Sequence, residues 1–108
     1  MKVGCVKEIK NNEFRVGMTP DNVKEYALRG HQVFVQTGAG IGSGFTDDAY
    51  AAAGASLLSL AADVWAASDM IVKVKEPLEL EYSLMREDQI IYTYLHLAAA
   101  RSLAQAML

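Results

Sequence analysis

Hydrophobic residues fall into short runs that alternate with amphipathic segments along the chain. Runs rich in Val, Ile or Leu, typical of strands, cover residues 2–7, 32–36, 56–58, 70–74 and 89–94. Helical segments are predicted between them at 20–29, 47–53 and 60–67, with a polar helical turn around 79–86. Parallel neighbouring strands need crossover connections, so this rhythm predicts an α/β domain: a mainly parallel sheet covered by helices on both faces.

Helix boundaries carry their own signals. Thr19 precedes Pro20, and a threonine hydroxyl can cap free backbone N–H groups while proline is tolerated at the first helical position. Thr46 is the second predicted cap, and Gly30 and Gly54 are predicted to end these two helices. From 98 to 108 the sequence favours helix but contains no terminator, so we expect the domain to continue beyond it.

Composition narrows the classes of function. The chain has 108 residues, 52% hydrophobic and 21% charged, as in one globular domain. Its net charge of -3 and the lack of a basic run argue against a nucleic-acid partner. We find neither a membrane span nor a signal-peptide core and predict a cytoplasmic protein. The single cysteine, Cys5, lies in an apolar run and is expected to be a buried thiol.

The glycine-rich loop at 38–44 invites comparison with dinucleotide-binding loops, whose backbone N–H groups approach a pyrophosphate. Its spacing does not fit, because Ser43 stands three residues after Gly40, where the fingerprint requires glycine. We therefore expect these glycines to serve unusual backbone angles, and we assign neither a cofactor-binding residue nor a metal ligand within the chain.

Three residues that could carry chemistry lie at predicted strand ends: Arg15, Lys75 and His96. Ligands of open parallel sheets bind outside the carboxyl ends of the strands, so these side chains can converge on one crevice. Together they suit a small anionic substrate, since a guanidinium holds a carboxylate bidentately and an imidazole moves a proton near neutral pH. Each also has a structural alternative: an ion pair of Arg15 with Glu13 or Glu8, a solvated Lys75, and a His96 satisfied near the core.

Several segments resemble the N-terminal region of alanine dehydrogenases, a family related to nicotinamide nucleotide transhydrogenases. The matching segments are 7–16, 19–20, 37–40, 44–45, 47, 72–77 and 92–98. The stretch 99–102 departs from the acidic and proline-containing sequence of the family, which affects the expected helix start there and not His96. The resemblance extends over essentially the whole chain.

The resemblance implies a fold, an activity and residue roles. Residues 1–108 would form the N-terminal part of a Rossmann-like (flavodoxin-like) substrate-binding domain, incomplete in this chain. Arg15 would clamp the substrate carboxylate, Lys75 would contact that carboxylate and the carbonyl oxygen, and His96 would be the general acid and base. The complete enzyme would interconvert L-alanine with pyruvate and ammonia and form a homohexamer. NAD would bind to a Rossmann domain absent from these residues, so the chain alone is expected to be inactive.

Other interpretations stay open. A transhydrogenase alpha subunit shares the opening and the glycine loop, although it needs no substrate-handling Lys75 or His96. A saccharopine dehydrogenase would use similar groups, but the Lys-Glu-Ile-Lys opening favours the alanine enzyme. Outside the enzymes, the polypeptide would be a catalytically inert fragment or an interaction module.

Overall fold

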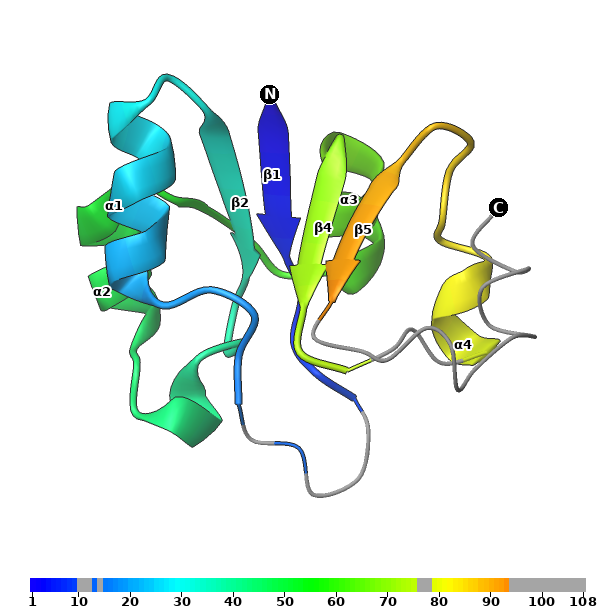
Figure 1. Cartoon of the computed structure of the whole chain (residues 1–108). Helices are drawn as coiled ribbons and strands as arrows, with labels where there is room; N and C mark the ends of the chain where they lie inside the picture. The colour runs from blue at the N-terminus through cyan, green and yellow to red at the C-terminus, as the bar shows by residue number, and fades with distance from the viewer. Residues whose placement is uncertain (10–12, 14, 76–78, 94–108) are drawn as a thin grey trace.

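A parallel β-sheet forms the centre of the molecule. The computed structural model describes residues 1–9, 13, 15–75 and 79–93. Its five strands pair in the order β3-β2-β1-β4-β5, and every pairing is parallel. They are β1 (Lys2–Cys5), β2 (Gln32–Gln36), β3 (Ser56–Leu58), β4 (Met70–Lys73) and β5 (Ile90–Thr93). In Figure 1 the arrows of the labelled strands β1, β2, β4 and β5 all point downward, so their carboxyl ends share one edge.

Helical segments connect the strands, as the sequence predicts. They are α1 (Pro20–Leu28), the 3-10 turn η1 (Ile41–Ser43), α2 (Asp47–Ala53), α3 (Ala61–Ala67) and α4 (Glu79–Tyr82). The helices α1 and α2 pack on one face of the sheet and α3 on the other, an arrangement that can be followed in Figure 1. The predicted α/β class, the parallel sheet and the coverage of both faces are therefore confirmed.

The alternation of side chains along the strands separates two apolar clusters. Toward α1 and α2, Val3 and Cys5 of β1 pack with Val33 and Val35 of β2. Toward α3, the fully buried Trp65 packs with apolar side chains of the opposite face. Successive strand residues point to opposite faces, and both faces are covered, so the central residues of β1 and β2 are apolar while polar residues stand at the strand ends.

The helix boundaries follow the predicted capping chemistry. The Asn22 N–H donates to the Thr19 hydroxyl at 3.3 Å, and the Thr19 N–H donates to the Asn22 side-chain oxygen at 3.0 Å. This reciprocal capping box satisfies two N–H groups at the start of α1. Gly54 follows α2 with a φ of 112°, a conformation that a side chain would disfavour. No helix in the described ranges is long and apolar enough to cross a membrane.

Two strands end earlier than predicted, for one physical reason. The first strand stops at Cys5 rather than Lys7, whose N–H donates to the Gln36 side chain at 2.8 Å. The fourth stops at Lys73 rather than Val74, whose N–H donates to the Glu8 carboxylate at 3.1 Å. Side-chain acceptors take these backbone donors at the carboxyl edge, so the sheet ladder is not extended there.

The chain changes direction across the sheet between β1 and β4. The connections from β1 to β2 and from β2 to β3 proceed outward on one side, and β4 then pairs with β1 on the other side. In open α/β sheets this topological switch point is where a crevice opens beyond the strand ends. The strand order fits the predicted Rossmann-like fold and directs attention to the residues that leave β1 and β4.

Candidate functional site

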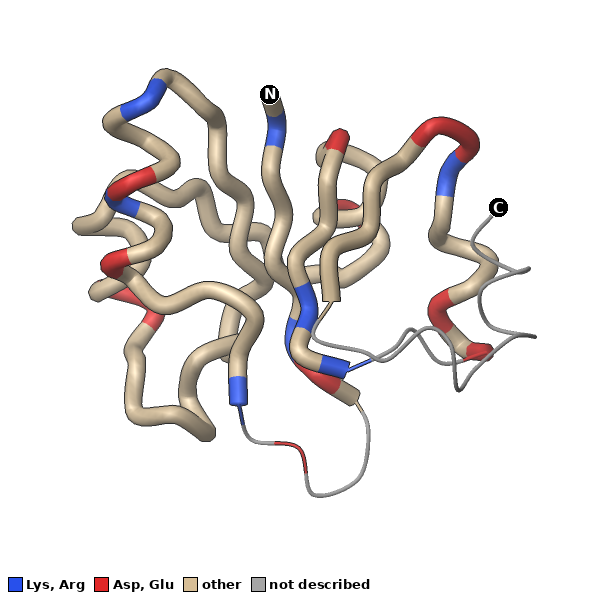
Figure 2. The backbone as a smooth tube through the Cα atoms, in the orientation of Figure 1, with Lys and Arg blue, Asp and Glu red and all other residues tan. Residues whose placement is uncertain are grey.

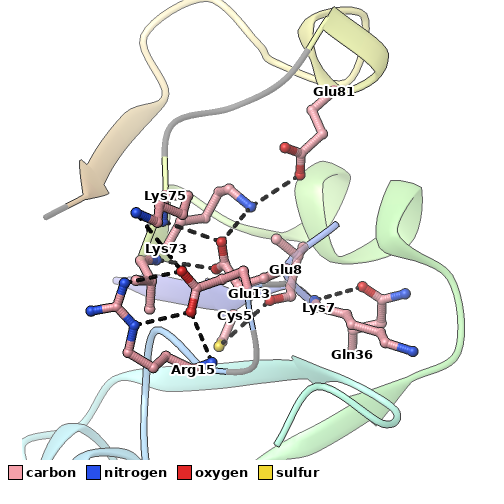
Figure 3. A network of polar contacts seen from close by, with 11 residues as sticks. Cys5, Lys7, Glu8, Glu13, Arg15, Gln36, Lys73, Lys75 and Glu81 are labelled. Atoms are coloured by element: carbon pink, nitrogen blue, oxygen red, sulfur yellow. Dashed lines mark hydrogen bonds and ion pairs between the residues drawn. The ribbon is translucent and has the colours of Figure 1, made fainter. Parts of the chain in front are cut away.

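Charged residues gather where β1 and β4 end. Figure 2 shows acidic and basic positions side by side at this edge of the sheet. Lys7 and Glu8 follow β1, Lys73 ends β4, and Lys75 comes two residues later. The segment that leads from β1 to α1 returns Arg15 to the same edge, where Figure 3 draws it beside Lys75.

Glu8 joins the ends of the two strands. Its Oε1 accepts the Lys75 N–H at 3.2 Å and lies 3.3 Å from the Lys73 Nζ, while its Oε2 accepts the Val74 N–H at 3.1 Å. The carboxylate that follows β1 thus accepts hydrogen bonds from two backbone N–H groups that follow β4. This arrangement fixes how β1 and β4 diverge at the switch point.

Lys73 is buried between two carboxylates. Its Nζ lies 3.3 Å from the Glu8 Oε1 and 3.2 Å from the Glu81 Oε2, and its side chain is 1% exposed. The side chains of Glu8 and Glu81 are 2% and 5% exposed. Because Glu81 belongs to α4, the ammonium attaches this short helix to the sheet (Figure 3). A charge buried this deeply requires such partners.

Arg15 binds a carboxylate bidentately. Its Nε donates to the Glu13 Oε2 at 3.0 Å, its Nη2 donates to Oε1 at 3.0 Å, and its backbone N–H donates to Oε2 at 2.9 Å. The Lys75 Nζ lies 4.0 Å from the same Oε1. Figure 3 shows this single carboxylate between the two cations. Bidentate geometry of this kind is how arginine recognises carboxylates in general.

The electrostatics of the pair follow from these contacts. Hydrogen bonds from the Arg15 side chain, and then from its backbone, lower the pKa of Glu13 from 4.5 to about 2. The same side-chain hydrogen bonds raise the pKa of the Arg15 guanidinium above its ordinary value. Glu13 is 5% exposed at its side chain, whereas Arg15 is 67% and Lys75 is 40% exposed. The cations therefore stay open to solvent around a carboxylate that is charged at neutral pH.

Backbone contacts fix the segment that carries Arg15. A Cβ added at Gly17 would lie 2.3 Å from the Val72 carbonyl oxygen, so only glycine permits this close approach to β4. The buried Tyr50 hydroxyl of α2 donates to the Met18 carbonyl at 2.6 Å. Arg15 is thus held between two elements of the fold by its neighbours along the chain.

A small cavity of about 60 Å³ opens beside the Arg15–Glu13 pair, enough for a few water molecules. It is lined by Lys7, Glu8, Glu13, Arg15, Gly38, Ala39 and Gly42. Charged side chains make up part of this lining, and the glycine-rich loop makes up the rest. The loop therefore contributes shape to the candidate site.

The backbone of the glycine-rich loop is engaged within the fold. The Gly38 N–H donates to the Asp47 carboxylate at 2.8 Å, and those of Ser43 and Phe45 both donate to the Gly40 carbonyl, at 3.0 and 2.9 Å. A phosphate would have to displace a carboxylate at Gly38, and the loop follows β2 rather than the first strand of the sheet. These residues do not fit a dinucleotide. Gly38 has a φ of 80°, as expected for a structural glycine.

The structure brings two of the three predicted site residues together. Arg15 and Lys75 face one carboxylate, and His96 lies outside the described residues. The ion pair of Arg15 with Glu13, foreseen as an alternative, is present. The buried pairing of Lys73 was not predicted. Its signal in the sequence is a lysine inside the apolar run 70–74, since a buried charge demands partners.

This arrangement suits the recognition of a small anion. A planar guanidinium and a nearby ammonium, both solvent-accessible, can bind one carboxylate at the carboxyl edge of the sheet. Over the described ranges, no group of three His, Cys, Asp or Glu side chains could hold a metal ion.

Known proteins are similar to this chain in sequence and fold. The family described as "Alanine dehydrogenase/PNT, N-terminal domain" matches residues 4–108. The chain is 52% identical to an alanine dehydrogenase of Mycobacterium tuberculosis and 51% identical to one of Methanococcus maripaludis, in each case over 100% of this chain and 29% of the relative.

Solved structures agree with these sequence relatives. An L-alanine dehydrogenase superposes with a TM-score of 0.93 at 53% identity, covering 99% of this chain and 29% of that one. A transhydrogenase from Sinorhizobium meliloti gives a TM-score of 0.91 at 33% identity, covering 99% of this chain and 32% of that one. The chain thus spans less than a third of the length of these relatives, and it belongs to the alanine dehydrogenase/PNT N-terminal domain family.

Proposed function

We propose that these residues form the N-terminal part of the substrate-binding domain of an NAD-dependent alanine dehydrogenase. The complete protein would deaminate L-alanine oxidatively to pyruvate and ammonia and catalyse the reverse reaction. The observation that carries the proposal is the shared carboxylate between Arg15 and Lys75 at the switch point of the sheet. Its sequence context supports it, since relatives named alanine dehydrogenase are about half identical over the whole chain.

In this proposal each site residue has a distinct role. Arg15 binds the substrate carboxylate through its planar fork, as it now binds Glu13. Lys75 neutralises the carboxylate and the carbonyl oxygen of pyruvate. His96 is the general acid and base, a role that comes from the family resemblance and from the ability of imidazole to transfer protons near neutral pH.

The cofactor of the proposed reaction is NAD, which would accept hydride from the substrate. We do not assign its site to the glycine-rich loop, because the N–H groups of Gly38, Ser43 and Phe45 already donate to acceptors within the fold. We infer that NAD binds to a separate Rossmann domain of the complete protein. By the same resemblance we propose that the complete enzyme is a cytoplasmic homohexamer.

A transhydrogenase subunit is the second candidate, and the superposition at a TM-score of 0.91 favours considering it. The higher identity to the L-alanine dehydrogenase structure, 53% against 33%, supports the first proposal. Such a subunit would also have no need of a substrate-handling Lys75 or His96.

The test is an assay of the complete protein. NADH formation should depend on both L-alanine and NAD, and Arg15→Lys should raise the KM for pyruvate about tenfold or more, because an ammonium cannot replace the bidentate fork. Arg29→Lys is the matched control, since Arg29 follows α1, is 75% exposed and lies 3.9 Å from the exposed carboxylate of Glu25. No alanine-dependent NADH, or an unchanged KM in Arg15→Lys, would refute the proposal.

A further inference from the structure

The carboxylate of Glu13 stands where a carboxylate ligand of Arg15 would stand. Both of its oxygens accept side-chain hydrogen bonds from the guanidinium, at 3.0 Å each, and Oε1 also faces Lys75 at 4.0 Å. A substrate carboxylate that used the same fork would need the same two donors. The two carboxylates cannot occupy this fork together, because each donor N–H is directed at one acceptor.

We propose that Glu13 is an internal competitor of the substrate, a carboxylate that occupies the Arg15 fork until an anionic substrate displaces it. This inference rests on the proposed role of Arg15 as the carboxylate clamp. It assigns to Glu13 control over affinity and over the charge of the ligands that are accepted. Glu13 itself takes no part in the chemical step.

The charge balance of the cluster supports displacement. Three carboxylates, Glu8, Glu13 and Glu81, are paired with three cations, Arg15, Lys73 and Lys75, and Lys7 is a further cation in the lining of the cavity. An anion added at the fork would place a second negative charge next to Glu13, whose cations are already paired with it. Departure of the Glu13 carboxylate into solvent restores the balance, because the incoming carboxylate takes over its cations.

The same cluster shows which carboxylate is free to leave. Glu8 is fixed by two backbone N–H groups from the other strand end and by the buried Lys73. Glu13 accepts one backbone N–H, from Arg15 two residues away, and its side-chain partners are Arg15, at 67% exposure, and Lys75, at 40% exposure. Ion pairs with exposed partners contribute little net free energy, so a ligand with further contacts can replace this one. With a pKa of about 2, Glu13 is a charged competitor at every pH near neutrality.

A consequence for ligand selection follows. A ligand that carries a carboxylate recovers the hydrogen bonds that Glu13 gives up, whereas a neutral ligand of the same size leaves Glu13 in place and gains no cation. The internal carboxylate therefore lowers affinity for all ligands at the fork, and only anionic ligands overcome it.

The test uses Glu13→Gln in the complete protein. Its neutral amide keeps the size of the side chain and weakens the competition. The dissociation constant of pyruvate, measured by calorimetry with NADH bound, should therefore fall about two- to fivefold, the factor expected for an ion pair whose cations are open to solvent. The KM for pyruvate should fall in parallel. Glu13→Ala removes the competing oxygens completely and should have an effect of the same sign.

Glu25→Gln is the matched control, because it removes the same charge from an exposed glutamate that pairs with Arg29 at 3.9 Å, and it should leave pyruvate affinity unchanged. Pyruvate binding that is unchanged or weaker in both Glu13 variants would overturn the proposal, because removal of a competing carboxylate has to raise the affinity for pyruvate. In an Arg15→Met background the effect of Glu13→Gln should vanish. If Arg15→Met alone left pyruvate affinity intact, the proposed clamp would fail, whereas a weakened Arg15→Met with no gain from Glu13→Gln would refute the competitor alone.

Discussion

Replacement of Lys73 by methionine tests the buried charge cluster most directly. The change keeps most of the side-chain volume and removes the ammonium that lies 3.3 Å from Glu8 and 3.2 Å from Glu81. Loss of one partner from a buried ion pair costs about 3–5 kcal/mol, since the remaining charge is left without compensation. Glu8 keeps the N–H groups of Val74 and Lys75, so we expect the lower end, about 3 kcal/mol.

The assay is equilibrium unfolding of the 108-residue chain in urea. Trp65 is the single tryptophan and is fully buried beside α3 and the sheet, so its fluorescence reports loss of this packing. With a urea slope of about 2 kcal/mol per molar, the midpoint should fall by roughly 1.5 M. Lys75→Met is the matched control, because Lys75 is 40% exposed and its loss should cost about 1 kcal/mol or less. Equal midpoints for the two variants would show that the buried cluster does not stabilise the fold as argued.

Three further outcomes follow from the same structure. Burial raises the pKa of the Cys5 thiol to about 11, so an aromatic disulfide reagent should label Cys5 in the native chain only at the rate of unfolding, and immediate labelling would contradict its burial. The pKa of Glu13 is lowered from 4.5 to about 2, so its ion pair stabilises the fold above pH 4.5, and this stabilisation is lost as the pH falls toward 2. The free energy of unfolding of Glu13→Gln, measured over the same pH range, should lack this part of the acid-induced loss. In the complete enzyme, His96→Ala should lower turnover by roughly 10²–10⁴-fold, and near-normal turnover across the pH range would remove His96 from catalysis.

Local patterns were enough to predict the elements of this fold. The capping threonines Thr19 and Thr46 act within three residues along the chain, and the alternation of apolar runs needs no knowledge of distant contacts. The errors lie at the ends of β1 and β4, where Lys7 and Val74 donate to side chains far away in sequence. Such acceptors cannot be identified before the strands are placed beside each other.

The candidate site was predictable only in part, for a similar reason. The positions of Arg15 and Lys75 at strand ends follow from the rule for parallel sheets. Their common partner, Glu13, depends on the path of the segment between β1 and α1, which no periodicity describes. The bond from Lys73 to Glu8 spans 65 positions along the chain, so its existence becomes evident only in three dimensions.

The anion site tolerates less change in its backbone at Gly17 than its exposed side chains suggest. A Cβ at position 17 would lie 2.3 Å from the Val72 carbonyl oxygen, so even alanine would force one of the two backbones to shift. Arg15 lies two residues before Gly17 and Lys75 three residues after Val72, so a shift of either backbone would change how the two cations are placed. Displacements near 1 Å can reduce enzymatic rates about 10²-fold. The placement of the two cations therefore depends in part on a residue without a side chain, and changes of ligand size at this site have to take this backbone contact into account.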